Sequence, residues 1–444
     1  MQSAKSVRID LFLNNLILFW NRFFLLPWTL AAQDRATNYL YWGSMLLISE
    51  RSDTAKTISA ATIHIVRGCD AILRLQGVLA DLSGKCGQPG VMDDVGYFLS
   101  KPGTLKRVPH LLLFSKSPVL DLERLTAEDL LGAVLLYRYV VLGCGIGIFS
   151  TNDRSGRGTL VAPAALRSGL AEMASRSLMD RGVLAVLISF RDGDGANSNT
   201  GASAGQPLGG SMADDKTARW VWRERETPDY LPLEQTFDGT LARIGTRTRR
   251  NMRYYRKRAE AELGCVFLPT VEIGRGEFLD FNRECMYAVP AKAASWRYQS
   301  LQHLETPLFM GVKDGKGRWL SLLGGRRHHN GTEILWQMNR SGLSAYSLSI
   351  VMRSYFMEHE IAHGMTKLYM EGGTAHPMRF SFVNDKVTDL VVVRRSRLGL
   401  VVPTLAHLFI KPDNELALML LDKSLYGGLP DGSRRLALPE ENVH

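Results

Sequence analysis

Residues 314–382 restrict the fold of this chain most, because strand-like and helix-like patterns follow one another there in a definite order. Two apolar runs, WLSLLGGR and TEILWQMNR, have strand composition and are joined by Asn330-Gly331, a dipeptide typical of tight hairpins. After the loop SGLSA, apolar residues recur every three or four positions from Tyr346 to about His363, which predicts a helix with one buried face. Gly364 ends that helix, and MTKLYMEGG predicts another strand. The predicted order is strand, hairpin turn, strand, loop, helix, strand.

The loop between the second strand and the helix is a candidate phosphate-binding loop. A strand that enters a Gly/Ser loop and then a helix presents free backbone N–H groups at the positive end of the helix dipole, and proteins use this arrangement to hold phosphate or pyrophosphate. An ordinary strand-to-helix turn that binds nothing has the same pattern, so the residues alone leave both interpretations open.

Residues 57–190 show a similar alternation. TISAATIHIV is strand-like, DAILRLQGVLADL has a helical repeat, and residues 131–150 predict two strands that meet near Gly143, Gly145 and Gly147. Pro163 is well placed in the first turn of a helix that runs to Asp180, and VLAVLISF predicts a further strand. Residues 191–217 hold almost no large apolar side chains, so we expect a disordered loop or linker before a strand resumes at Trp220.

Composition limits the class of protein. The chain has 444 residues, 45% of them hydrophobic and 22% charged, which is typical of globular domains. Its net charge of +10 favours an anionic partner such as nucleic acid, an anionic lipid surface or a phosphorylated cofactor. The five cysteines are far apart and form no C-x-x-C pair. A disulfide framework and a zinc site are therefore not expected, and a reducing cytoplasm is the favoured location.

Residues 9–30 form the most apolar stretch, but Asp10, Asn14, Asn21 and Arg22 interrupt it. A membrane-spanning helix would bury these polar groups in hydrocarbon. A helix packed on a domain is the favoured interpretation, and an interfacial helix in peripheral contact with a membrane and a signal peptide are the alternatives.

The order of elements from about Thr236 to Val393 resembles the acyltransferase domain of the GNAT superfamily, in the branch of the CelD-like proteins and, more distantly, the FemAB aminoacyl transferases. The matching stretches are RIGTRTRRNMRYYRKR at 243–258, PLFMGVKDGKGRWLSLLGGRR at 307–327, WQMNRSGLSAYSLS at 336–349 and LYMEGGTAHPMRFSF at 368–382. Their order and spacing carry the resemblance.

The resemblance implies a mixed α/β (α+β) fold of two tandem GNAT-like domains, each a mixed, mostly antiparallel sheet flanked by helices. We expect an apolar N-terminal helix and extension at 1–56, a first domain at 57–235 that includes the loop 191–217, a second, acyltransferase domain at 236–400 and a C-terminal extension at 401–444.

The resemblance also implies direct transfer of an acyl group from acyl-CoA or a phosphopantetheinyl acyl carrier protein to an amine or hydroxyl, with no metal and no covalent enzyme intermediate. The enzyme positions the acceptor, removes its proton and stabilises the developing oxyanion. In such domains the carrier's phosphates sit on the loop between the fourth strand and the next helix. Here that loop supplies Arg340, Ser341, Gly342 and Ser344.

Eight Arg or Lys residues fall between Arg243 and Arg258, on a segment with a helical pattern. A solvated basic face is the simple interpretation, but cations this close repel one another and are better explained by an anion nearby. In the family a similar helix opens the second domain and faces the interdomain cleft. The candidate contacts for a phosphorylated donor or acceptor are Arg247, Arg249, Arg250 and Arg253.

The candidate proton-handling residues are Glu371, His376 and Tyr346, and Arg379 stands where the family often has a basic residue that contacts a substrate anion. His328 and His329 lie in the predicted hairpin tip, where an exposed, uninvolved pair is expected. His359 and His363 are spaced i, i+4, but EHEIAH lacks the H-E-x-x-H order and a third ligand, so no metal site is predicted.

Two functions follow as hypotheses. The first is an N- or O-acyltransferase that acts on a small biosynthetic intermediate or a saccharide with an acyl-CoA or carrier-protein donor. The second is a role that depends on tRNA, either FemAB-like aminoacyl transfer or non-catalytic nucleic-acid binding. Salt separates them, because binding to many phosphates weakens steeply with ionic strength.

Overall fold

The computed structural model describes residues 57–58, 60–88, 90–101, 106–118, 121–141, 144–151, 155–191, 217–370 and 381–395. The chain divides into two units, 1–41 and 42–444, and every described residue belongs to the second. The expectations for residues 1–56, for 401–444 and for all but the ends of the loop 191–217 fall outside the described residues.

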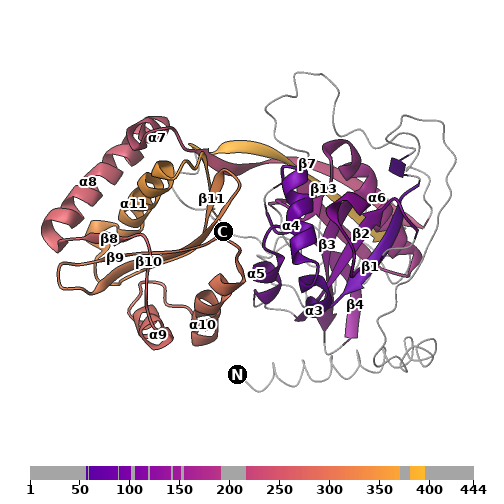
Figure 1. The fold of residues 1–444 in the computed structure, drawn as a ribbon, viewed down its shortest axis with the longest axis horizontal. Helices are drawn as coiled ribbons and strands as arrows, with labels where there is room; N and C mark the ends of the chain where they lie inside the picture. The colour runs from indigo at the N-terminus through magenta and orange to yellow at the C-terminus, as the bar shows by residue number, and fades with distance from the viewer. Residues whose placement is uncertain are drawn as a thin grey trace, which may run out of the picture. The chain divides into compact units, whose positions relative to one another are not determined.

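The described strands form one mixed sheet that helices flank, which confirms the predicted mixed fold class (Figure 1). Its order is β1-β2-β3-β4-β6-β13-β7-β12-β11-β10-β9-β8, and β5 pairs with β3 off this path. The strands are β1 (Thr62–Arg67), β2 (Lys106–Ser115), β3 (Leu130–Val141), β4 (Cys144–Ser150), β5 (Leu160–Val161), β6 (Ala185–Arg191), β7 (Ala218–Pro232), β8 (Val266–Leu268), β9 (Pro307–Lys313), β10 (Trp319–His328), β11 (Gly331–Asn339), β12 (Lys367–Met370) and β13 (Val383–Arg394).

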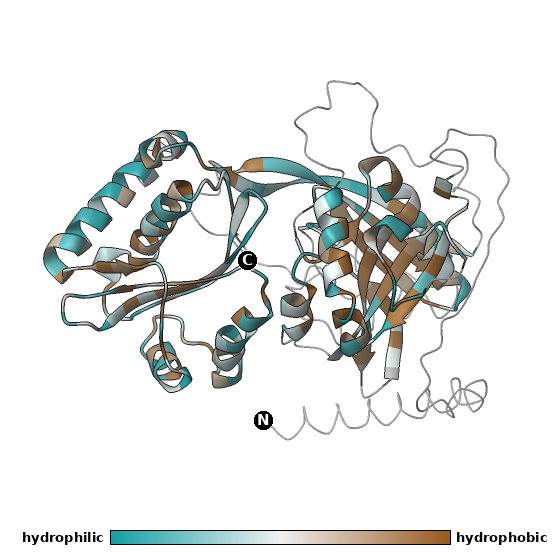
Figure 2. Ribbon diagram, in the orientation of Figure 1, coloured by the Kyte–Doolittle hydropathy of each residue, from teal (hydrophilic) through white to brown (hydrophobic). Residues whose placement is uncertain are grey.

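Residues 57–191, called the first half below, bury both faces of their strands. Along β2, Leu112 and Phe114 pack against α6 (Ala164–Asp180) on one face, while Leu111 and Leu113 pack on the other. That second face is covered by α3 (Cys69–Leu73), α4 (Gln76–Lys85) and α5 (Val95–Ser100). Burial on both faces explains the uninterrupted apolar run of this strand, and Figure 2 shows the strands of this half as predominantly hydrophobic.

One predicted helix of the first half is two. The run DAILRLQGVLADL was expected to form a single helix, but α3 ends at Leu73 and α4 begins at Gln76. The amide of Leu75 donates to the carbonyl of Ile72, an i→i+3 bond that tightens the chain between them. Gly77, a weak helix former, follows directly.

Residues 236–370, called the second half below, also have helices on both faces of the sheet. One face packs on α7 (Phe237–Arg243), α8 (Thr246–Leu263) and α11 (Leu348–Ala362) through Met310, Leu323 and Ile334. The other packs on α9 (Arg275–Arg283) and α10 (Ala291–Ser300) through Leu322, Trp336 and Met338. The predicted order of hairpin, loop, helix and strand is confirmed, because β10 and β11 pair antiparallel and α11 leads back to β12, parallel to β11.

The strand β13 joins the two halves. It pairs antiparallel with β6 on one side and with β7 on the other, and its Leu390 and Val392 lie in the core of the first half. The gap between β6 and β7 is therefore filled by a strand from the far end of the described chain. Among the described helices, none is both long and apolar enough to cross a membrane.

Candidate functional site

A β-bulge in β11 marks the place where two parallel strands stop pairing. Opposite β10, Ile334 pairs with Gly325 and Trp336 pairs with Gly324, so Leu335 is an extra residue on β11. On the other side, the pairing of β12 with β11 among the described residues runs from Gly331 to Ile334, the residue just before the bulge. Bulges bend a strand and redirect its side chains, and they are frequent beside active sites.

A cavity of about 460 Å³ lies at this bulge. Leu335 and Trp336 of β11 and Met370 at the end of β12 line it, together with residues from α5, α10 and the first half. Its other lining residues are Gly90, Val91, Tyr97, Phe98, Lys101, Arg107, Tyr137, Thr151, Ser155, Arg157, Trp296, Arg297, Arg326 and Glu333. Five of these side chains are cationic and only Glu333 is a carboxylate, so the lining is basic as well as aromatic.

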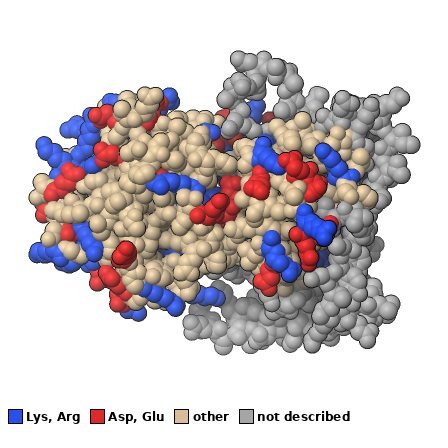
Figure 3. All heavy atoms as spheres, viewed as in Figure 1, with Lys and Arg blue, Asp and Glu red and all other residues tan. Residues whose placement is uncertain are grey.

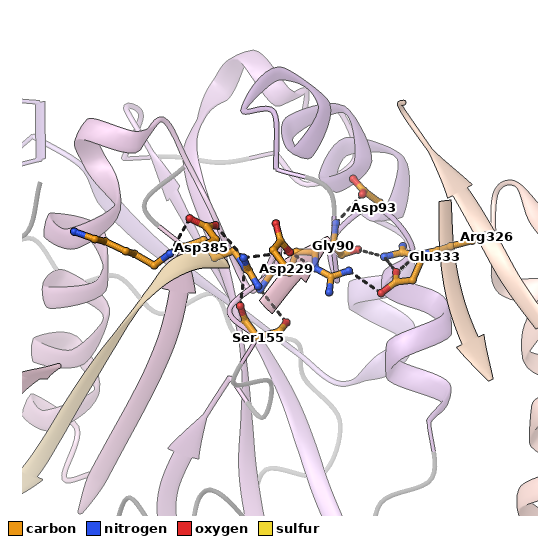
Figure 4. A network of polar contacts seen from close by, with 10 residues as sticks. Gly90, Asp93, Ser155, Asp229, Arg326, Glu333 and Asp385 are labelled. Atoms are coloured by element: carbon orange, nitrogen blue, oxygen red, sulfur yellow. Dashed lines mark hydrogen bonds and ion pairs between the residues drawn. The ribbon is translucent and has the colours of Figure 1, made fainter. Parts of the chain in front are cut away.

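Arg326 belongs to a buried polar network at the cavity wall, and Figure 4 shows it beside Gly90 and Glu333 at one end of that network. Its side chain is 0% exposed and donates to Glu333 at 2.8 Å, to Asp94 at 2.7 Å and to the carbonyl of Gly90 at 3.0 Å. The three partners come from β11, from the N-cap of α5 and from the loop before it. A fully buried guanidinium is tolerated because these acceptors replace the water that it loses.

Arg157 continues the network into the first half. It donates to Glu333 at 2.8 Å, lies 3.4 Å from Asp229 of β7 and places its guanidinium 4.5 Å from the centre of the Tyr369 ring. Beyond Asp229, Arg191 lies 3.1 Å from that carboxylate and 2.9 Å from Asp385 of β13. One chain of alternating charges therefore links β10 and β11 to β7, β6 and β13.

These pairs set the protonation of Glu333. Burial by itself would raise the pKa of this carboxyl, but Arg326 and Arg157 outweigh burial and hold the pKa at about 2. Glu333 is therefore an anion throughout the neutral range, and it is not suited to accept a proton from a substrate.

The predicted phosphate-binding loop is ordered and follows β11. The guanidinium of Arg340 contacts Glu284 at 2.6 Å and donates to the carbonyl of Trp319 at 2.6 Å, so it is used within the protein. Ser341 and Ser344 are exposed, and Gly342 has φ +74°, a left-handed conformation that favours glycine. The described lining of the cavity includes no residue of this loop.

Of the three candidate proton-handling residues, only Tyr346 lies within the described residues. Its hydroxyl donates to Glu262 at 2.9 Å, and Arg258 stacks 4.9 Å from its ring centre. The hydrogen bond to Glu262 raises the pKa of Tyr346, and the side chain does not line the cavity. Glu371, His376 and Arg379 fall outside the described residues. Met370, the residue before Glu371, does line the cavity.

The basic helix α8 carries its cations away from this cavity. No residue of α8 belongs to the described lining, and the contact of Arg247, Arg249, Arg250 and Arg253 with a phosphorylated donor or acceptor stays a prediction. Arg253 pairs with Asp238 at 2.7 Å, whereas the other three have no ion pair among the described residues. Figure 3 shows basic side chains gathered where Figure 1 places α8, interspersed with acidic ones.

The expectation for His328 is wrong. This residue was predicted to be exposed with His329 at the hairpin tip, but it is buried, with its ring 5.1 Å from that of Tyr369. Burial and the nearby Arg326 lower the pKa of His328 to about 3, so the imidazole is neutral. Its neighbour His329 is exposed and lies beside Gly84 of α4. A hairpin turn does join β10 and β11, but it lies one residue earlier than predicted, at His329 and Asn330, and His328 is buried against Tyr369.

His359, Glu360 and His363 form a cluster whose ligand atoms all lie within 4.8 Å of one another. Both oxygens of Glu360 accept from Arg327, at 2.8 and 2.7 Å, and His363 Nδ1 contacts the carbonyl of His359 at 2.8 Å. The carboxylate is thus already matched by a bidentate arginine, which explains its burial without a metal ion.

Sequence reasoning missed most residues that line the cavity, including Trp296, Arg297, Arg326 and Glu333. The Asn330-Gly331 signal misplaces the register, because a turn centred on these two residues would put Arg326 opposite Leu335. The structure centres the turn on His329 and Asn330, pairs His328 with Gly331 and so sets Arg326 opposite Glu333.

Comparisons with known proteins give similarities to solved structures alone. No family model matches this chain, and no curated protein does. The chain is similar to FemX (9% identity, TM-score 0.44, covering 70% of this chain and 95% of that one). It is also similar to a tandem GNAT protein from the clavulanic acid biosynthesis pathway (11%, 0.39, 75% and 99%) and to L-PGS from Bacillus licheniformis (11%, 0.40, 72% and 91%). Proteins of the kind that the sequence resemblance named are thus among the solved structures to which this chain is similar.

Proposed function

We propose that this protein is an acyltransferase that moves an acyl group directly from an acyl carrier to an amine or hydroxyl bound in the cavity. The observation that carries the proposal is the coincidence of the cavity with the bulge at Leu335, where β11 and β12 stop pairing. Beyond Ile334, β11 continues to Asn339 with no pairing to β12 among the described residues.

A strand edge that no described residue pairs with suits an extended donor that carries amide groups. Backbone N–H and C=O groups of an unpaired strand bind such a chain as an added strand would. A phosphopantetheine arm has this chemistry, so acyl-CoA or a phosphopantetheinyl acyl carrier protein is the proposed donor. Its phosphates are proposed to lie on the loop of Arg340, Ser341, Gly342 and Ser344, and its thioester to reach the cavity beside Leu335.

Other residues around the cavity have separate proposed roles. Arg326 and Glu333 stabilise the cavity wall. Because Glu333 stays an anion, another group must accept the proton of the acceptor. Glu371 is the proposed base, because it follows Met370, which lines the cavity. The acceptor is proposed to be a small biosynthetic intermediate or a saccharide.

One observation favours the alternative, in which the donor is an aminoacyl-tRNA. Arg247, Arg249 and Arg250 of α8 have no ion pair among the described residues, and unpaired arginines on one helix attract a polyanion. In that case α8 binds the tRNA, and the cavity still receives the aminoacyl end.

Native mass spectrometry of freshly purified protein tests the donor, because a co-purified CoA species, carrier protein or tRNA names its class. A cavity-filling variant tests the place of reaction. We expect Met370→Trp to abolish acyl transfer, and the matched variant Val266→Trp, on edge strand β8 with 53% exposure, to leave transfer unchanged. Full activity of Met370→Trp would place the reaction elsewhere.

A further inference from the structure

Arg297 is a cation of the cavity that has no carboxylate partner among the described residues. Arg326 and Arg157 are matched by Glu333, Asp94 and Asp229, as described above. Arg297 of α10 is half-buried, lines the same cavity and makes no ion pair with any described residue. Desolvation lowers the pKa of its guanidinium, and the acidic groups that face it are Tyr97 and Cys285, both uncharged at neutral pH. The protein thus keeps a partly desolvated positive charge at the cavity wall without a carboxylate opposite.

Trp336, which lines the same cavity, carries a second donor without a partner among the described residues. Trp336 is 6% exposed, and its indole N–H finds no hydrogen-bond acceptor in the described part of the chain. A buried N–H group without a partner is costly and uncommon, and a ligand acceptor removes that cost. The ring of Trp336 is fixed by Phe278 and Phe309, whose centroids lie 5.7 and 5.9 Å away, so its N–H group has a set direction.

Flat apolar surface completes this side of the cavity. Trp296 and Tyr97 line it with ring centroids 5.3 Å apart, and the indole of Trp296 already donates to Ser100 at 3.1 Å. Because this N–H group is already used, Trp296 offers a ligand the apolar face of its ring. Rings of this kind bury planar groups effectively.

We propose that Arg297 and the indole N–H of Trp336 bind an oxyanion of the acceptor, a carboxylate or a phosphate, and that the acceptor carries a flat apolar group next to it. This inference rests on the proposed function, in which the donor phosphates lie on the loop that begins at Arg340. Arg340 is four steps along the chain from Trp336, a distance of about 13 Å in an extended strand. An anion at Arg297 is thus distinct from the donor phosphates and belongs to the other substrate.

Isothermal titration calorimetry with three probes tests the inference. Phenyl phosphate and benzoate combine a ring with an oxyanion, and benzyl alcohol is the neutral counterpart. We expect the wild type to bind at least one of the anions and to bind benzyl alcohol at least about tenfold more weakly, because a charge-assisted hydrogen bond is lost. The preferred anion tells whether the natural group is a phosphate or a carboxylate.

Variants assign the binding to its residues. Arg297→Gln should weaken binding of the preferred anion by about tenfold or more, whereas Lys292→Gln, which removes an exposed cation from the same helix, should not. Trp336→Phe keeps the apolar packing and should weaken binding of the preferred anion a few-fold. If Arg297→Gln does not fold, the binding measured for Trp336→Phe tests the inference in its place. Unchanged binding in Arg297→Gln, or equal binding of benzyl alcohol, would overturn the inference.

Acetyl-CoA titrated into the same variants separates this inference from the proposed function. We expect Arg297→Gln to bind acetyl-CoA as the wild type does. Loss of acetyl-CoA binding in Arg297→Gln would assign Arg297 to the donor and overturn the acceptor site. A wild type that binds the aryl anions but neither acetyl-CoA nor an acyl carrier would overturn the proposed donor and leave the anion site intact.

Discussion

Replacing Arg326 with Met should destabilise the protein by about 3–5 kcal/mol at neutral pH. The substitution removes three hydrogen bonds at once and leaves the buried carboxylates of Asp94 and Glu333 without their shared cation. Removal of one partner from a buried ion pair typically costs this much, because the remaining charge stays out of water. Such a loss is a large share of the roughly 5–15 kcal/mol that stabilises most folded domains.

The pKa of Glu333 gives a second route to the magnitude and adds a pH dependence. The fall from an ordinary 4.5 to about 2 corresponds to about 3 kcal/mol. Because the folded pKa lies below the unfolded one, this stabilisation is fully present above pH 4.5 and disappears as the pH falls from 4.5 towards 2. The difference between wild type and Arg326→Met should therefore be largest at pH 7 and smaller at pH 3.5.

Equilibrium unfolding in urea, followed by circular dichroism at both pH values, measures the two differences. The matched control is Arg283→Met, which removes an ion pair with Asp280 whose side chains are 74% and 66% exposed. We expect the control to change stability by no more than about 0.5 kcal/mol. A loss below about 1 kcal/mol for Arg326→Met at pH 7, or a loss independent of pH, would refute this account of the network.

Three further predictions concern the sequence-derived candidates. Glu371→Gln should lower the turnover number by roughly a hundredfold or more while donor binding survives; near-full turnover across pH would exclude it as the base. Replacing Arg249 and Arg250 together with Glu should weaken binding of an anionic partner without unfolding, and an unchanged salt-dependent affinity would leave α8 a solvated face. Limited proteolysis should cut first within 191–217, because its composition cannot bury enough surface; first cleavage near residue 235 would contradict this.

The parts of the fold that local patterns specify were predictable. Asn330-Gly331 located the hairpin to within one residue, since the turn is at His329 and Asn330, and the three- and four-residue spacing located α11 to within two residues at its start. A left-handed Gly264, with φ +62°, ends α8 beyond the predicted basic run. In each case the deciding interactions lie within one or two turns of the chain.

The cavity was not predictable for the opposite reason. Arg326 meets Asp94 across 232 residues of sequence, and Arg157 meets Glu333 across 176. The hydrophobic periodicity of a sequence carries no information about contacts between residues so far apart in the chain. The same holds for Tyr346, chosen as a proton-handling residue, whose hydroxyl is taken by Glu262 on a helix 84 residues earlier.

The insertion of β13 between β6 and β7 has a consequence for synthesis on the ribosome. When β6 emerges, its edge and the core beneath it still lack Leu390 and Val392 of β13. The first residue of β13, Val383, leaves the ribosome 192 residues after Arg191 (383 − 191). At typical translation rates of about 5–20 residues per second, that interval is roughly 10–40 s. During this time an apolar strand edge is open to other chains, which is the situation that chaperones relieve. Nascent chains stalled before residue 383 should therefore expose a β6 edge that full-length chains conceal.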